Sequence, residues 1–402
     1  QALQFGDGSH MNDRSGIGRF GMGLPSASVS QCRRVDVWTW RQGVDSALHS
    51  YIDLDEVIAG VQRDVPAPEP EGIPEFWRSV GSEFGKSGTL VVWSKLDRLL
   101  WRTGKAIMDN SEFLVARMYR QFLVTGQVKI RLATHTNEDE SAKHEWNALA
   151  NDPGYLMVPS STPEPYGDKA MFQPDGDSWI VRHSIEMGGQ THDVDIKFTF
   201  AKPEARNHKS AGGKPYGKHA SRNIGVSLVR AGRELQLDES FVHTSEARDR
   251  WWGVEVDFPP ELDELFGVTN NKQSARNFTE LAGRLEGLKE SDGWTEFLNE
   301  LEEDGDPRLP LVEILDLIHR RIRQLRNIIK LQRAGAAKGE GGRYGKGSPE
   351  DKGTQATKER QEEGHKGVSD EDEGLTDDEK KDKIRDELVK DGVDPSDADI
   401  IA

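Results

Sequence analysis

The order of apolar and polar residues predicts a chain that begins with strands and ends with helices. Residues 34–40 alternate between apolar and polar side chains, which is the period of a half-buried strand. The run 88–93 is more continuously apolar and is typical of a short buried strand. Strands are predicted over 34–40, 50–55, 88–93, 128–132, 179–183, 194–200, 225–229 and 253–258. Helices are predicted over 110–122, 277–288 and 294–302.

Six apolar residues in the last predicted helical region follow alternating spacings of four and three. Such a seam is typical of a coiled coil or of a packed helical hairpin. It consists of Leu311, Leu315, Ile318, Ile322, Leu325 and Ile329. From residue 335 onward glycine and charged residues dominate, so we predict a disordered acidic tail with a short helix near residues 382–389.

The same pattern divides the chain into five parts. Residues 134–177 are polar and rich in turn-forming residues, so we interpret them as a linker or insertion. Strand-rich parts precede it (1–133) and follow it (178–280), and a helical or coiled-coil segment (281–334) leads into the tail (335–402). Strands mixed with helices in this way indicate the α/β class, with an α+β sandwich as the first part.

Composition limits the cellular compartments and the partners expected for the protein. One cysteine, Cys32, excludes an internal disulfide, and no apolar run is long enough for a membrane span, so we predict a cytoplasmic protein without membrane contact. The net charge of −17 argues against a nucleic-acid binder at first sight. However, residues 336–402 hold 12 Lys and Arg against 20 Asp and Glu, which leaves the rest of the chain only mildly acidic. A locally basic face is compatible with this distribution, for instance around residues 202–218.

A glycine-rich string near the start of the chain is the strongest chemical signal. Gly18, Gly21 and Gly23 allow positive φ angles, and small residues that suit a helix follow them. A glycine turn that enters a helix exposes backbone N–H groups, to which phosphate is the natural ligand. No Lys-Ser/Thr pair closes the turn as in a Walker loop, and a tight packing turn is the alternative interpretation.

The sequence of this string, residues 17–28, resembles the ATP-lid glycine box of the GHKL superfamily. This superfamily includes gyrase B, the heat-shock-ninety chaperones, MutL and histidine kinases. The MORC-like and heat-shock-ninety-like forms are the most similar. The resemblance implies that 1–133 is part of a Bergerat-fold domain, that Ser26 and Ser28 cap the helix, and that the backbone wraps the β- and γ-phosphates of ATP. The residues implied for this role are Gly18, Arg19, Phe20, Gly21, Met22, Gly23 and Leu24.

Two further motifs follow in the order found in the same superfamily. Gly88-Thr89 resembles the strand that floors the nucleotide pocket, which implies that the hydroxyl of Thr89 joins the adenine-side network. The string 268–273 resembles the end of a transducer domain, which implies that Lys272 reaches the γ-phosphate as a catalytic cation. Residues 225–235 resemble a strand-turn-strand of that domain. In isolation, Thr89 is a good strand former and Lys272 a solvated lysine.

One part of the superfamily pattern is missing. GHKL ATPases carry a Glu (the general base) and an Asn (the Mg²⁺ ligand) on a helix before the lid, and no Glu precedes the lid here. Asp7-Gly8 resembles the pre-lid segment more than the motif that reads adenine. We therefore interpret the chain as N-terminally truncated and predict that it does not hydrolyse ATP as it stands.

The resemblance implies a function for the intact protein. Binding and slow hydrolysis of Mg-ATP would order the lid and drive a domain rearrangement, often with closure of a homodimer. The alternative is a non-hydrolysing nucleotide-gated clamp, or an interaction module, that acts on DNA or a partner protein. The histidines lack the spacing of metal ligands, so no protein-held metal site is predicted.

Overall fold

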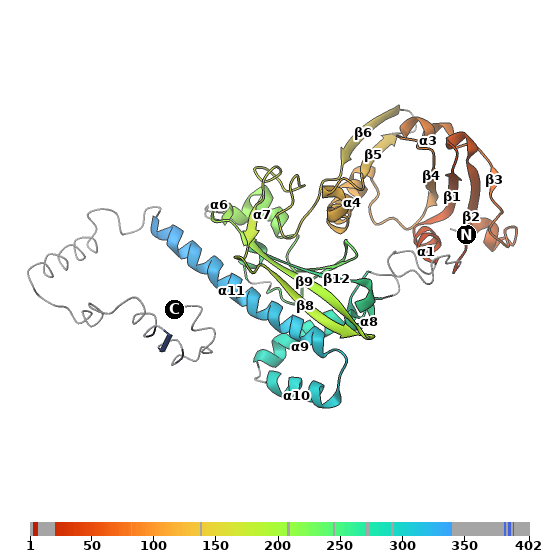
Figure 1. Ribbon diagram of the computed structural model, residues 1–402. Coiled ribbons are helices and arrows are strands. Elements are labelled where there is room, and N and C mark those ends of the chain that lie inside the picture. Colours follow the sequence, from red (N-terminus) through yellow and green to blue (C-terminus); the bar gives the residue numbers. More distant parts are fainter. Residues whose placement is uncertain are drawn as a thin grey trace, which may run out of the picture. The chain divides into compact units, whose positions relative to one another are not determined.

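The computed structural model describes residues 3–6, 21–81, 83–136, 139–206, 210–243, 246–269, 273–290 and 293–339, with Asp382, Arg385, Asp386 and Val389. The chain divides into two units, Gln1–Arg333 and Ala334–Ala402. The first unit mixes sheets and helices, so the predicted α/β class is confirmed (Figure 1). Within the described ranges, no helix is both long and apolar enough to cross a lipid bilayer.

The first sheet has four antiparallel strands in the order β3-β2-β1-β4 (Figure 1). The strands are β1 (Cys32–Trp40), β2 (Leu48–Asp53), β3 (Glu69–Pro70) and β4 (Gly88–Leu96). The short helices around it are α1 (Gly23–Val29), η1 (Val44–Ser46), α2 (Leu54–Ile58) and α3 (Glu75–Val80). The strand predicted over 50–55 ends at Asp53, because this side chain accepts a hydrogen bond from the Asp55 N–H and caps α2.

Two helices and a hairpin connect this sheet to the next one. They are α4 (Gly104–Met118), α5 (Arg120–Val124), β5 (Arg131–Thr136) and β6 (Asp139–Asn147). The stretch interpreted as a linker, 134–177, therefore contains strands, and it also contributes Tyr155, Met171 and Phe172 to the largest apolar core. Its polar composition hides these few residues, which are buried by contacts with segments far away in the sequence.

The second sheet has six strands in the order β11-β10-β12-β9-β7, and β8 also pairs with β9. They are β7 (Phe172–Pro174), β8 (Ile180–Met187), β9 (Gln190–Ala201), β10 (Val226–Arg230), β11 (Arg233–Asp238) and β12 (Trp252–Phe258). The strand-turn-strand predicted over 225–235 is confirmed as the hairpin β10–β11. Ala231 and Gly232 make its turn with φ angles of +50° and +77°.

The remaining helices follow or interrupt this sheet. They are α6 (Pro203–Arg206), η2 (Ala211–Gly213), α7 (Pro215–Ala220), η3 (Asp249–Trp251), η4 (Pro260–Leu262), α8 (Asp263–Phe266), α9 (Arg276–Glu290), α10 (Trp294–Asp304) and α11 (Leu309–Gly339). All six residues of the predicted seam are buried in α11, in the same apolar core as Phe198 and Val256 of the sheet. The seam therefore packs within the chain itself.

The other side of the second sheet is ionic. Alternation along β12 places Glu255 opposite the apolar face, where it meets Arg120 of α5 at 2.5 Å and Lys197 of β9 at 2.6 Å. Arg120 also donates to Glu234 at 2.8 Å and to Ser227 at 2.7 Å, and is fully buried. We call these five residues the Arg120 cluster. It connects α5, which follows the first sheet, to four strands of the second.

Charges in the Arg120 cluster change the titration of its members. Burial alone would raise the pKa of Glu255, but Arg120 and Lys197 hold it below its ordinary value. Next to the cluster, burial and then the charge of Glu255 raise the pKa of Asp257 to about 6. The two cations therefore favour the ionised form of Glu255, whereas the neighbouring Asp257 is harder to ionise.

Candidate functional site

The glycine string ends on the first sheet. Gly21 has a φ of +60°, a conformation that glycine adopts without strain. Helix α1 begins at Gly23 after Met22, which makes no side-chain cap. Ser26 and Ser28 lie inside the helix, so the expectation that they cap it is wrong; Ser28 Oγ instead donates to the Leu24 carbonyl at 2.8 Å. Gly18, Arg19 and Phe20 lie outside the described residues.

Helix α1 packs against one face of this sheet. Leu24 contacts the apolar cluster of Val35, Val37 and Ile52, which also includes Leu3. The indole N–H of Trp93, on β4, donates to Ser28 Oγ at 2.9 Å. The face that carries α1 is therefore the one to which Val35 and Trp93 belong, and these two residues are paired across β1 and β4.

Thr89 lies on the same face of the sheet. It is four residues before Trp93 on β4, and side chains an even number of positions apart on a strand point to the same side. A strand rise of about 3.3 Å per residue separates the two by roughly 13 Å. Thr89 pairs with Thr39 of β1, and their hydroxyl oxygens are 3.3 Å apart. The structure thus brings the described end of the glycine string and Thr89 to one face.

The structure corrects the expectation that 88–93 is a buried strand. β4 is at the edge of the sheet, and none of its residues is buried. Gly88 is required here for packing, because a Cβ on this residue would come within 2.3 Å of the Trp40 ring. Packing against Trp40 therefore explains the glycine of the Gly-Thr pair. The exposed hydroxyl of Thr89 remains available to bind a ligand.

The end of the face around Thr89 is open and apolar. Leu48 pairs with Thr39, so it belongs to this face together with Val91 and Trp93. These three side chains remain 38%, 38% and 39% exposed. Among the described residues, these large apolar side chains share the face with two hydroxyls, a combination suited to a flat, weakly polar ring. Sequence reasoning missed Leu48 and Trp93, although the alternation of β4 already placed Trp93 on the side of Thr89.

The opposite face of the sheet is occupied by internal ion pairs. Lys95 donates to the nearly buried Asp53 at 2.8 Å, and Arg34 reaches the same carboxylate at 3.3 Å. The side-chain bond from Lys95, helped by Arg34, holds the pKa of Asp53 below its ordinary value. Trp38 stacks on His49 next to this group, with ring centroids 4.4 Å apart. Because these charges already have partners, the α1 face is the better candidate for a ligand.

Lys272 lies outside the described residues, but the ends of its loop are described. Val268 and Ala275 form an isolated bridge, and the Ser274 carbonyl accepts from the Thr269 N–H at 3.1 Å. Gln236 of β11 accepts from the Ala275 N–H at 3.0 Å, so the loop is anchored to the second sheet. In the described part of the chain, no three His, Cys, Asp or Glu side chains converge to hold a metal ion.

Comparison with known proteins identifies the first segment. Residues 1–79 match the family described as histidine kinase-, DNA gyrase B- and HSP90-like ATPase. No curated protein matches the chain. Among solved structures, the chain is similar to the 43K ATPase domain of Thermus thermophilus gyrase B in complex with an aminocoumarin, at 12% identity and a TM-score of 0.26, over 76% of this chain and 74% of that one. Residues 1–79 are thus similar to the ATPases of the GHKL superfamily.

Proposed function

We propose that this protein binds Mg-ATP on the α1 face of the first sheet and uses the bound nucleotide to change its conformation. The family match over residues 1–79 supports ATP binding in general. The observation that carries the specific site is that the described end of the glycine string and the exposed Thr89 hydroxyl share one open face. We assign the MORC-like or heat-shock-ninety-like subtype from the sequence of the glycine string alone.

In this proposal the two ends of the ligand are bound by different residues. Backbone amides of Gly18 to Leu24 surround the β- and γ-phosphates, and the positive φ of Gly21 supports a close approach of the backbone. Thr89 lies on the adenine side, where Leu48 and Val91 supply apolar contact to the base. Thr89 and Trp93, the residue of β4 that contacts α1, are roughly 13 Å apart along the strand, a distance compatible with an extended nucleotide.

Charge at the phosphates comes from two sources in the proposal. Lys272 reaches the γ-phosphate from the loop between α8 and α9, where a cation stabilises charge that develops in phosphoryl transfer. Mg²⁺ neutralises phosphate oxygens when it is bound with ATP. We assign it no ligand from the described residues, and the superfamily pattern expects that ligand upstream of the lid.

The predicted domain limits are part of the same proposal. Residues 1–133 bind the nucleotide, and 178–280 act as the transducer that receives the movement of the lid through Lys272. The Arg120 cluster supports this coupling, since it connects the helix that follows the first sheet to strands of the second. Closure of a homodimer and slow hydrolysis complete the cycle; a nucleotide-gated clamp without hydrolysis is the alternative.

Thermal unfolding of the full chain with and without Mg-ATP tests the site. A ligand at a hundred times its Kd stabilises the folded state by about 2.7 kcal/mol. Thr89→Val keeps the shape of the side chain and removes the hydroxyl, so it should reduce this stabilisation by about 1 kcal/mol. Thr191→Val, at an exposed position of β9, is the matched control and should leave the stabilisation unchanged.

Two outcomes separate the alternatives. Gly21→Val forces a β-branched residue to a φ of +60° and should abolish the stabilisation by ATP. Release of phosphate by the full-length gene product would identify an ATPase, whereas stabilisation of that product without release would identify the clamp. Absence of any stabilisation by Mg-ATP in the wild-type chain would contradict the proposed site.

A further inference from the structure

The second half of helix α11 concentrates positive charge in an acidic protein. Residues 317–339 contain seven Lys and Arg and no Asp or Glu, although the whole chain has a net charge of −17. The first half of the helix carries acidic side chains at Glu313 and Asp316. Charge is thus separated along the helix, with the positive half toward its C-terminal end.

The positive side chains divide between two sides of α11. Ile322, Leu325 and Ile329 are buried in the core, which fixes how the helix is rotated. Four positions on the outer side are exposed and follow one another at intervals of three or four residues: Arg320, Arg323, Asn327 and Lys330. At a rise of 1.5 Å per residue this row extends for about 15 Å. We call these four residues the α11 stripe.

Cations on the inner side already have structural partners. Arg326 forms two bonds to Asp249, at 2.7 and 2.8 Å, and Arg321 pairs with Asp175 at 2.7 Å. On the α11 stripe, Arg320 pairs with Asp316 at 3.1 Å. Within the described ranges, Arg323 and Lys330 have no carboxylate partner. Folding therefore accounts for the inner cations, whereas Arg323 and Lys330 of the stripe are left available and Arg320 has a carboxylate neighbour.

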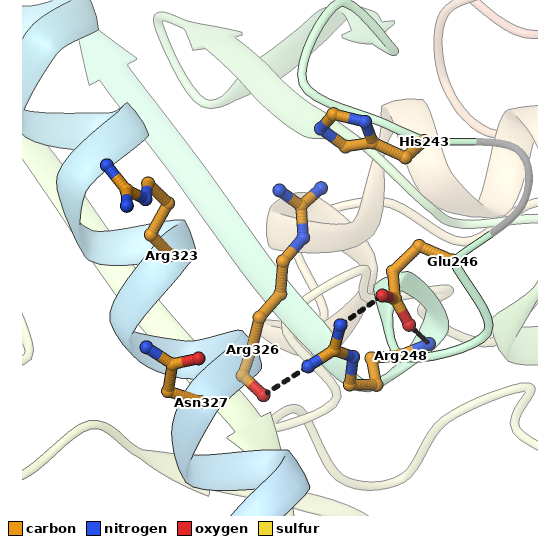
Figure 2. A pocket seen from close by; sticks show the side chains of 6 residues that line it. All are labelled: His243, Glu246, Arg248, Arg323, Arg326 and Asn327. Carbon is orange, nitrogen blue, oxygen red and sulfur yellow. Dashed lines mark hydrogen bonds and ion pairs between the residues drawn. The ribbon is translucent and has the colours of Figure 1, made fainter.

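A cavity of about 360 Å³ lies beside the stripe (Figure 2). Its lining consists of His243, Glu246, Arg248, Arg323, Arg326 and Asn327. Glu246 is the one carboxylate among these six, and the bond from Arg248 lowers its pKa to about 2. Arg248 in turn donates to the Arg326 carbonyl at 3.3 Å, which holds the segment just before η3 against α11. Arg323 is left as an uncompensated cation of the cavity, and Asn327 adds an amide that can donate.

Further cations lie on the segments attached to this part of α11. Arg206 donates to the Ile329 carbonyl at 3.3 Å and connects α6 to the helix. Arg250 donates to the Gly212 carbonyl at 3.1 Å. The segment that follows Gly212 carries the exposed Lys214 and Lys218. Within the range 202–218, where a basic face is expected, Arg206 therefore contacts α11 directly.

We propose that the α11 stripe and its cavity bind the phosphodiester backbone of a nucleic acid. A straight row of cations matches a polymer with regularly spaced phosphates, and amide side chains are common donors to phosphate oxygens. An anionic membrane would need several apolar side chains beside the cations, and exposed positions 320–331 hold one, Leu331. The proposal is independent of ATP binding, because none of these residues belongs to the first sheet.

Fluorescence anisotropy of the full chain, without nucleotide, tests the proposal. The probes are a labelled DNA duplex of about 20 base pairs and single strands of DNA and RNA of the same length. The test variant is Arg320→Glu/Arg323→Glu/Lys330→Glu. The matched control reverses three exposed cations elsewhere in the described ranges for which no carboxylate partner is seen, Arg63→Glu/Arg102→Glu/Lys129→Glu. Both variants change the net charge equally, so long-range effects cancel.

We expect the wild-type chain to bind at least one probe with an affinity that falls as salt rises. The stripe variant should bind at least about tenfold more weakly, and its salt slope on duplex should be smaller by roughly 0.9 for each lost contact. The control should stay within about twofold of wild type. Arg320→Gln/Arg323→Gln/Lys330→Gln replaces the test variant if reversal impairs folding, as judged by circular dichroism. Equal loss in stripe and control variants, no binding by wild type, or binding to anionic vesicles alone would overturn the proposal.

Discussion

The two sheets of this protein depart from the usual distribution of polar and apolar residues in opposite ways. The first sheet leaves Leu48, Val91 and Trp93 exposed on the face that carries α1. The second sheet packs apolar residues against α11 on one side and buries charges around Arg120 on the other. Exposed apolar surface and buried charge are the informative exceptions in a folded protein.

The difference separates surface that is available for binding from surface used for structure. Glu234, Glu255 and Lys197 have ion-pair partners within the Arg120 cluster at 2.5 to 2.8 Å, so they connect helix α5 to strands of the second sheet. Among the described residues, the apolar side chains of the first sheet lie partly exposed beside the Thr89 hydroxyl. In the proposed function, the first sheet binds the ligand and the second transmits its effect.

Breaking the Arg120 cluster should have the largest effect on stability. Arg120→Leu removes the buried cation shared by Glu234 and Glu255, leaves them only Arg117 and Lys197, and should lower the free energy of unfolding by about 3 to 5 kcal/mol. Arg182→Leu removes an exposed ion pair with Asp195 and should cost less than about 1 kcal/mol. Urea unfolding at neutral pH measures both. Adding Glu234→Gln to Arg120→Leu should recover part of the loss; equal costs for Arg120→Leu and Arg182→Leu would refute the distinction.

Asp257 should make the free energy of unfolding depend on pH, with an effect of intermediate size. Its pKa in the folded protein, about 6, is higher than the ordinary value of 3.8, so the native state binds this proton more tightly than the unfolded state does. The resulting stabilisation is complete below pH 3.8 and is lost as the pH rises through 6. Asp257→Asn should thus be more stable than wild type by about 1 to 3 kcal/mol at pH 8, a difference that shrinks toward pH 4. A difference that does not vary with pH would show that Asp257 titrates normally.

The same substitution in both sheets should give the smallest effect in the first. Val91→Thr, on the open face, should change the free energy of unfolding by less than about 0.5 kcal/mol. Val256→Thr buries a hydroxyl in the core of the second sheet and should cost about 1 to 3 kcal/mol. Thermal unfolding of both variants provides the measurement. A large cost at Val91 would mean that the face around Thr89 is covered in the native protein.

Local sequence patterns predicted those elements that depend on neighbouring residues. Strand β1 and the seam of α11 were predicted correctly, because each depends on a local period. The half-buried alternation expected for 34–40 is wrong, since residues 35–38 are all buried and apolar clusters lie on both faces of the sheet. Strands within 134–177 were missed, since polar residues dominate β6 and β7 is too short to show a period. Arg120 gave no signal at all: its partners Glu234 and Glu255 are 114 and 135 positions away.

The sequence by itself determined the glycine string, its superfamily and the apolar seam of the long helix. Only the tertiary structure decided that Thr89 shares a face with α1, that this face is open, and that the cations of α11 divide into a paired inner side and an exposed stripe. The physical reason is the range of the interactions. The periodicity of a helix or strand depends on residues that are neighbours in the sequence. Exposure and pairing of a side chain depend on which distant segments pack against it.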